Sequence, residues 1–127
     1  MEWNMFLKDI TDKIIQAAMK VHSVLGPGLL ENVYETCLAH ELKKTGLEVK
    51  TQVVLPVIYD DIKMDIGYRL DLLVDDKVIV ELKSVEKILP IHEAQLISYL
   101  KISKKKVGLL INFNVVHLKT GIKRFMN

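Results

Sequence analysis

The chain has 127 residues, of which 50% are apolar, with three prolines, one cysteine and a formal net charge of +2. This length and composition predict one domain, residues 1–127, with its own core, and they exclude a disordered chain. The single cysteine excludes an internal disulfide framework and indicates a cytoplasmic protein, and no apolar run reaches the ~20 residues of a membrane span.

Two amphipathic helices are expected in the first third of the chain. Residues 1–8 are expected to form a loose lead-in, and Asp9 or Thr11 to cap the first helix. Apolar residues then recur at a period of about 3.6 until Gly26-Pro27-Gly28 stops the helix. The same periodicity returns in a second helix from about Leu29 to Lys44.

The middle of the chain predicts strands joined by acidic turns. Residues 48–59 alternate as one long strand would, with Pro56 indicating an edge or a bend. Asp60-Asp61 turns the chain, and residues 62–66 either extend this strand or pair with a neighbour. A hairpin is then expected over residues 71–83.

The length of the hairpin turn decides which side chains meet. A two-residue turn would pair Asp71 with Val80 and place Asp71 on the opposite face from Glu81. A three-residue turn, or a bulge, would instead place Asp71 opposite Glu81. Glu81 and Lys83 are two apart on one strand and therefore share a face. The second arrangement gathers all three side chains into one cluster.

This cluster of two carboxylates and a lysine has two interpretations. It is a hard-oxygen site suited to Mg²⁺ or Mn²⁺, or it is an exposed hairpin face that carries a Glu81–Lys83 salt bridge. Asp71, Glu81 and Lys83 by themselves leave both interpretations open.

The last third of the chain predicts a helix followed by strands. The helix runs from Leu89 to about Ile102, and Gln95 and Tyr99, four apart, share one of its faces. Residues 107–113 form a continuous apolar run, as in a strand covered on both sides. Residues 115–118 are a further candidate strand. The order of elements is that of a mixed α/β domain.

Positive charge is concentrated in the same third. Residues 1–82 carry 9 Lys and Arg against 14 Asp and Glu, whereas residues 83–127 carry 9 against 2. This asymmetry indicates a surface for a polyanion, and the alternative is a solvated basic face. Arg69 either reaches a phosphate or neutralises the carboxylates. The other residues expected to contact phosphates are Lys101, Lys104, Lys105 and Lys106.

The hairpin residues resemble a known motif. Asp71, a nine-residue spacer and Glu81-Leu82-Lys83 are similar to the motif of the PD-(D/E)XK nuclease superfamily, with Leu70 in place of its proline. More closely, the chain resembles the GxxExxxR protein family, small bacterial and archaeal proteins of that superfamily. The matching pieces follow in order along the chain: Val21-His22, Leu25-Gly-Pro-Gly-Leu-Leu-Glu31, Tyr34-Glu35, Gly67-Tyr-Arg-Leu-Asp71, Val80-Glu-Leu-Lys83, His92-Glu-Ala-Gln95 with Tyr99-Leu100, and Gly108-Leu-Leu-Ile-Asn-Phe113.

The resemblance implies a fold and a set of roles at the hairpin. The fold is the restriction-endonuclease-like αβββαβ core, a mixed central sheet flanked by helices. Asp71 and Glu81 resemble the carboxylates that bind Mg²⁺ or Mn²⁺. Lys83 resembles the lysine that positions or activates the attacking water.

The same resemblance assigns three residues outside the hairpin to the site. Glu31 resembles the first-helix acid that some members use as a further metal ligand. Its alternative role is that of a first-turn Glu favoured by the helix dipole. Gln95 and Tyr99 resemble the Gln-x-x-x-Tyr feature of recombination-type nucleases, with Gln95 near the chemistry and Tyr99 near the nucleic acid.

The expected function is therefore that of a metal-dependent nuclease acting on DNA in repair, recombination or defence. The alternative is a catalytically silent nucleic-acid-binding or protein-interaction module on a nuclease fold. The small domain carries no specificity insert, which favours the alternative or a homodimer or protein partner that supplies the missing contacts. No association with a membrane is expected.

Overall fold

A five-stranded sheet with strand order β1-β4-β5-β6-β7 is the centre of the structure. The computed structural model describes residues 5–127. The elements follow in the order α1 (Met5–Leu25), α2 (Glu31–Lys44), β1 (Val49–Val54), β2 (Val57–Tyr59), β3 (Ile62–Met64), β4 (Arg69–Val74), β5 (Val78–Lys83), α3 (Pro90–Ser103), β6 (Val107–Asn112), the 3₁₀ helix η1 (Leu118–Gly121) and β7 (Ile122–Met126). The strands β5 and β6 are parallel and the other neighbouring pairs of the sheet are antiparallel. This confirms the expected mixed α/β sheet.

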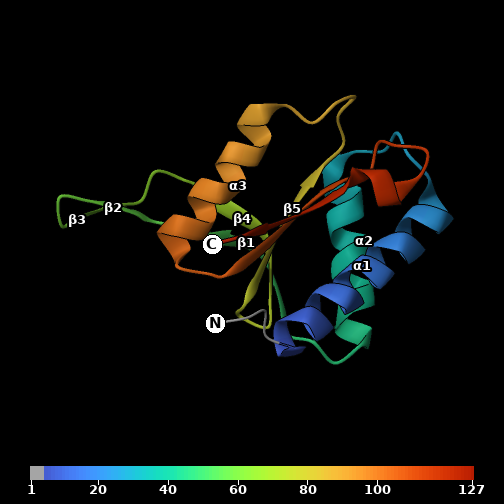
Figure 1. Ribbon diagram of the computed structural model, residues 1–127, viewed down its shortest axis with the longest axis horizontal. Coiled ribbons are helices and arrows are strands. Elements are labelled where there is room, and N and C mark those ends of the chain that lie inside the picture. Colours follow the sequence, from blue (N-terminus) through green and yellow to red (C-terminus); the bar gives the residue numbers. More distant parts are fainter. Residues whose placement is uncertain (1–4) are drawn as a thin grey trace.

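Helices cover both faces of this sheet. The helices α1 and α2 lie on one face and α3 lies on the other (Figure 1). Val80 and Leu82 of β5 belong to the apolar cluster under α1 and α2, whereas Ile79 belongs to the cluster under α3. Because side chains alternate along a strand, Glu81 and Lys83 share the α3 side of β5 with Ile79.

The first helix begins earlier than its sequence suggests. Helix α1 starts at Met5, so the expected lead-in is wrong for residues 5–8, and residues 1–4 lie outside the described part. Leu7 packs against the apolar cluster, which extends the buried stripe by one turn. Thr11 is inside the helix and donates its hydroxyl to the Lys8 carbonyl at 3.0 Å, so it is not a cap. No helix within residues 5–127 is both long and apolar enough to span a membrane.

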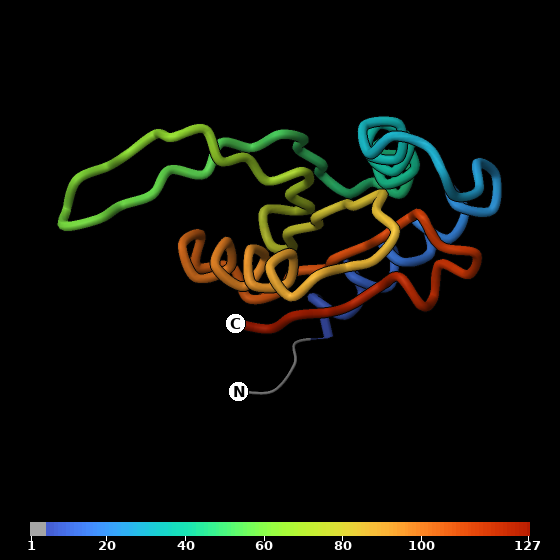
Figure 2. The backbone as a smooth tube through the Cα atoms, turned by 90° about the horizontal axis from the view of Figure 1, so that it is seen from above, coloured from blue at the N-terminus to red at the C-terminus, as the bar shows by residue number. Residues whose placement is uncertain are grey.

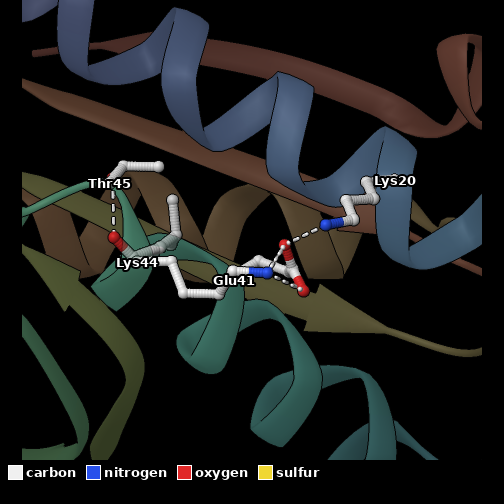
Figure 3. A network of polar contacts seen from close by, with 5 residues as sticks. Lys20, Glu41, Lys44 and Thr45 are labelled. Carbon is white, nitrogen blue, oxygen red and sulfur yellow. Dashed lines mark hydrogen bonds and ion pairs between the residues drawn. The ribbon is translucent and has the colours of Figure 1, made fainter.

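A small ionic network joins α1 to α2 at the surface. Lys20 Nζ lies 2.9 Å from Glu41 Oε1, and Lys44 Nζ lies 3.3 Å from the same atom (Figure 3). The hydrogen bond from Lys20 is the largest cause of the lowered pKa of Glu41. Ion pairs this exposed contribute little to stability. The buried stripes therefore hold the two helices together, and the network only orients them.

The expected long strand over residues 48–59 is wrong. It is broken after Val54, and β2 pairs with β3 in a separate two-stranded ribbon. The ribbon projects from the body of the molecule (Figure 2). Pro56 has no N–H to donate to a ladder, which accounts for the break. Asp60 and Asp61 both adopt left-handed backbone angles, φ 57° and 61°, which close the tight turn at the tip.

The candidate strand over residues 115–118 is also wrong. This segment bends away from the sheet into η1, and β7 then returns to pair with β6. The buried Leu118 anchors the loop in the core. Gly121 lies directly against the backbone carbonyl of Asn112, where a Cβ atom would overlap that oxygen.

We expect Gly121→Ala to destabilise the fold by about 1–3 kcal/mol, because the added methyl group has no room beside a rigid backbone atom. Urea unfolding followed by circular dichroism measures this change. Lys119→Ala, two residues earlier on the exposed surface, is the matched control and should shift stability by less than about 0.5 kcal/mol. Equal stability of the two variants would contradict the steric argument.

Candidate active site

The hairpin register places the two central carboxylates opposite each other. Val74 pairs with Val78, which confirms the three-residue turn over residues 75–77. Continuing the same register brings Asp71 opposite Glu81. The sequence argument for this arrangement depended only on the turn length, and the turn has the length it required.

Side chains connect the two strands where the backbone ladder ends. The regular pairing stops at Leu72 and Val80. Beyond it, the Asp71 N–H donates to Glu81 Oε2 at 3.0 Å, and the Leu82 N–H donates to Asp71 Oδ2 at 2.9 Å. Each carboxylate is thus held by the backbone of the opposite strand through one oxygen, while its other oxygen faces away from that bond.

Burial disfavours the charged form of both carboxyl groups. Glu81 is only 6% exposed, and its burial, followed by the charge of Asp71, raises its pKa to about 8. Burial also raises the pKa of Asp71, with the charge of Glu31 acting in the same direction. In residues 5–127 no lysine or arginine forms an ion pair with either carboxylate. The interpretation as an exposed face with a Glu81–Lys83 salt bridge is therefore wrong.

Lys83 stands beside the pair without bonding to it. Its positive charge lowers the pKa of both Asp71 and Glu81, although other effects outweigh it. The half-buried Lys83 side chain also lines a groove of about 500 Å³, together with Gln95 and Tyr99 of α3. The fold thus brings Lys83, Gln95 and Tyr99 into one groove, and Lys83 and Tyr99 interact electrostatically with the carboxylates.

Glu31 reaches the same region from the start of α2. Its Oε2 accepts the Ser84 N–H at 3.3 Å, one residue beyond Lys83. Its charge raises the pKa of both Asp71 and Glu81. Glu31 is solvent-exposed and borders the pair, so its direct ligation of a metal stays a prediction.

Two further residues belong to this cluster and were missed from the sequence. Gln52 Nε2 donates to Glu35 Oε1 at 2.6 Å and to Asp71 Oδ1 at 3.4 Å. Burial raises the pKa of Glu35, and the charges of Asp71 and Glu31 add to it. The four-residue spacing of Glu31 and Glu35 on one helix was a signal for Glu35. The sequence contains no such signal for Gln52, because its position opposite Asp71 follows from the pairing of β1 with β4.

The basic residues divide into two groups. Arg69 is exposed at the start of β4, two residues before Asp71, and Lys101 is exposed on α3. The run from Lys104 to Lys106 precedes β6, whose parallel partner β5 begins at that end of the sheet. It therefore lies roughly 17 Å along the strands from Lys83.

The lysine run is also partly engaged by another segment. Lys105 Nζ donates to the Asp76 carbonyl at 2.9 Å and lies 3.2 Å from its carboxylate. The structure does not bring Lys104, Lys105 and Lys106 to the carboxylate pair. Their contact with phosphates stays a prediction.

The donor set at the pair suits a hard divalent cation. Among residues 5–127 no three His, Cys, Asp or Glu side chains are grouped closely enough to hold a metal by themselves. Magnesium, however, commonly takes one or two carboxylates from the protein and completes its shell with water and substrate phosphate. Asp71 and Glu81 fit that mode, because Glu81 Oε1 accepts no hydrogen bond in the described part and their charge lacks a counterion.

A family model described as the PD-(D/E)XK nuclease superfamily matches residues 8–125. The chain belongs to the PD-(D/E)XK nuclease superfamily. Members of this superfamily are generally nucleases, and the mixed sheet flanked by helices confirms the expected restriction-endonuclease-like fold. No curated protein and no solved structure matches the chain significantly.

We expect the stability of this nuclease-superfamily domain, freed of metal with EDTA, to fall as the pH rises from about 4.5 to about 8. Glu81 keeps its proton up to about pH 8 when folded, whereas an unfolded Glu loses it near 4.5. The folded state therefore holds the extra proton in this window, and each pH unit costs up to about 1.4 kcal/mol. The raised pKa of Asp71 acts in the same direction.

Urea unfolding at several pH values checks this expectation. Glu81→Gln should flatten the slope and make the domain more stable than the wild type near pH 8, because the amide cannot ionise. Glu86→Gln, on the exposed loop after β5, should keep the wild-type slope. A slope shared by all three proteins would show that Glu81 is not the group that titrates.

Proposed function

We propose that this chain is a divalent-metal-dependent nuclease that hydrolyses DNA phosphodiesters, and that it belongs to the GxxExxxR family. The buried Asp71–Glu81 pair beside Lys83, with no ion-pair partner in the described residues, carries the proposal. Burying two carboxyl groups side by side without a cation is costly. A fold that needed only stability would pair them with a cation or replace them with apolar side chains.

In this proposal the metal ion and the side chains of the protein have separate chemical roles. A bound Mg²⁺ or Mn²⁺ would neutralise the phosphodiester and lower the pKa of a water molecule. Asp71 and Glu81 would hold the ion with their carboxylate oxygens, of which Glu81 Oε1 accepts no hydrogen bond in the described part, and Glu81 would have to be ionised to do so. Lys83 lines the groove, and its ammonium group orients the attacking water and stabilises charge that develops on the phosphate.

The surrounding residues have supporting roles in this proposal. Glu31 adds a third negative charge at the edge of the pair and strengthens the hold on the cation. Gln95 presents a neutral amide in the same groove as Lys83, where it can bind the water or a phosphate oxygen. Arg69, two residues before Asp71, and Lys101, in the last turn of α3, are exposed and bind phosphates away from the scissile bond.

Cleavage assays test the nuclease directly. We expect Mg²⁺ or Mn²⁺, and not EDTA, to support cleavage of at least one DNA substrate among linear, circular, single-stranded and branched forms. Lys83→Ala and Asp71→Asn should each lower the rate by about 10²-fold or more, since the first removes a cation that stabilises the reacting phosphate and the second removes a carboxylate that holds the ion. Lys87→Ala, on the exposed loop after β5, is the control and should match the wild type.

Two outcomes would overturn the assignment. Cleavage that survives Lys83→Ala would place the activity elsewhere or in a contaminant. A wild type that binds metal and DNA but cleaves none of the substrates would be a silent binding module on a nuclease fold.

We expect Glu31→Gln to weaken Mn²⁺ binding about ten-fold, because a charge that borders the pair helps to hold the cation. Isothermal titration calorimetry with Mn²⁺ alone measures this without any substrate. Glu86→Gln removes one exposed charge from the loop after β5 and should leave the affinity unchanged. If Glu31→Gln lowers the melting temperature and leaves Mn²⁺ affinity intact, Glu31 serves the helix dipole instead.

A further inference from the structure

The groove that Lys83 lines has walls of an unusual kind for a phosphate-binding surface. It is lined by residues of α3 and by Tyr68, which directly precedes β4. Tyr68 and Tyr99 lie across from each other with ring centroids 5.9 Å apart and an interplanar angle of 57°. Ile91 and Ile102 add aliphatic wall. The exposed side chains of this groove are therefore largely apolar.

Exposure distinguishes the two rings. Tyr99 is 6% exposed and forms the inner wall, whereas Tyr68 is 42% exposed and forms the open wall. Tyr99 also connects the groove to the carboxylate pair, because the charges of Glu81 and Asp71 add to burial in raising the pKa of its phenol. A ligand seated against Tyr68 would thus lie next to Lys83 and close to the two carboxylates.

The charge of the groove limits what it can hold. Among the described residues that line it, Lys83 is the single Lys, Arg, Asp or Glu. A groove that follows a phosphate backbone needs several cations along its length. One such cation suits a single phosphate. The tyrosine and aliphatic side chains suit the flat face of a base, and His92, Gln95 and Ser98 are the other polar residues of the lining.

We propose that this groove binds an unpaired nucleobase of the DNA strand to be cut, stacked on Tyr68, with the scissile phosphate at Lys83. The proposal rests on the nuclease function above and narrows its substrate class. A base inside a duplex is stacked on both sides and cannot enter such a groove without being flipped out. The substrate is therefore single-stranded DNA, or a duplex with an unpaired end or flap at the cleavage point.

Binding and cleavage measured side by side test this proposal. Fluorescence anisotropy compares a labelled single-stranded oligodeoxynucleotide with its own duplex, with Ca²⁺ in place of Mg²⁺. We expect the wild type to bind the single strand about ten-fold more tightly than the duplex. Tyr68→Ala should weaken single-strand binding about ten-fold and change duplex binding by less than about two-fold, because only stacking is lost.

Matched variants separate stacking from folding. Tyr68→Trp keeps an aromatic face and should retain the single-strand preference, whereas Tyr68→Leu keeps apolar bulk and should lose it. Tyr59→Ala removes an exposed tyrosine from the tip of the ribbon and should behave as the wild type. If Tyr68→Ala does not fold, as judged by circular dichroism, the Trp and Leu variants decide the question.

The outcomes distinguish this proposal from the nuclease function. The base site is overturned if the wild type binds single strand and duplex with equal affinity. It is also overturned if Tyr68→Leu loses the same amount of affinity for both. Either result counts even if the protein cleaves duplex DNA in Mg²⁺. A Tyr68-dependent preference for the single strand in a protein that cleaves nothing supports the base site and overturns the nuclease.

Discussion

The exchange of hydrogen bonds between Asp71 and β5 is the constraint on which the site depends. Each of the two carboxylates is held by an N–H of the opposite strand, at the point where regular backbone pairing stops. The carboxylates therefore cannot turn away from each other into solvent. Their shared burial raises the pKa of both and leaves a place whose natural counterion is a divalent cation.

The rest of the fold keeps this unfavourable arrangement in place. The strands β4 and β5 are central in the sheet, and apolar clusters cover them on both faces. A second polar chain leads inward from α2, where Glu35 accepts a hydrogen bond from Gln52, which also reaches Asp71. Gln52 adopts a left-handed backbone angle, φ 52°. Strain of this kind persists where surrounding structure enforces it, and it is concentrated at functional sites.

The two ends of the sheet have different chemistry. The end that carries Lys83 combines carboxylates with an aromatic and aliphatic groove, and the other end carries the lysines from Lys104 to Lys106 beside the hairpin turn. The uneven distribution of charge along the chain suggested a surface for a polyanion in the last third. The parallel pairing of β5 with β6 separates the lysine run from Lys83. It sets the start of β6, which follows the lysines, against the start of β5, whereas Lys83 is at the end of β5. Stacking of a base on an aromatic side chain adds affinity for a single strand without requiring a further positive charge.

Local sequence determined the features that depend on near neighbours along the chain. The alternation in β4 and β5 and the three-residue turn were enough to set Asp71 opposite Glu81, and the four-residue spacing put Gln95 and Tyr99 on one face of α3. The early start of α1 and the break after Val54 were not predicted, since packing of Leu7 and a separate ribbon decided them. Only the tertiary structure joined Glu35 and Gln52 to Asp71 and placed Tyr68 against Tyr99. These contacts join residues far apart in the chain, and their geometry is decided by how helices and strands pack rather than by any local periodicity.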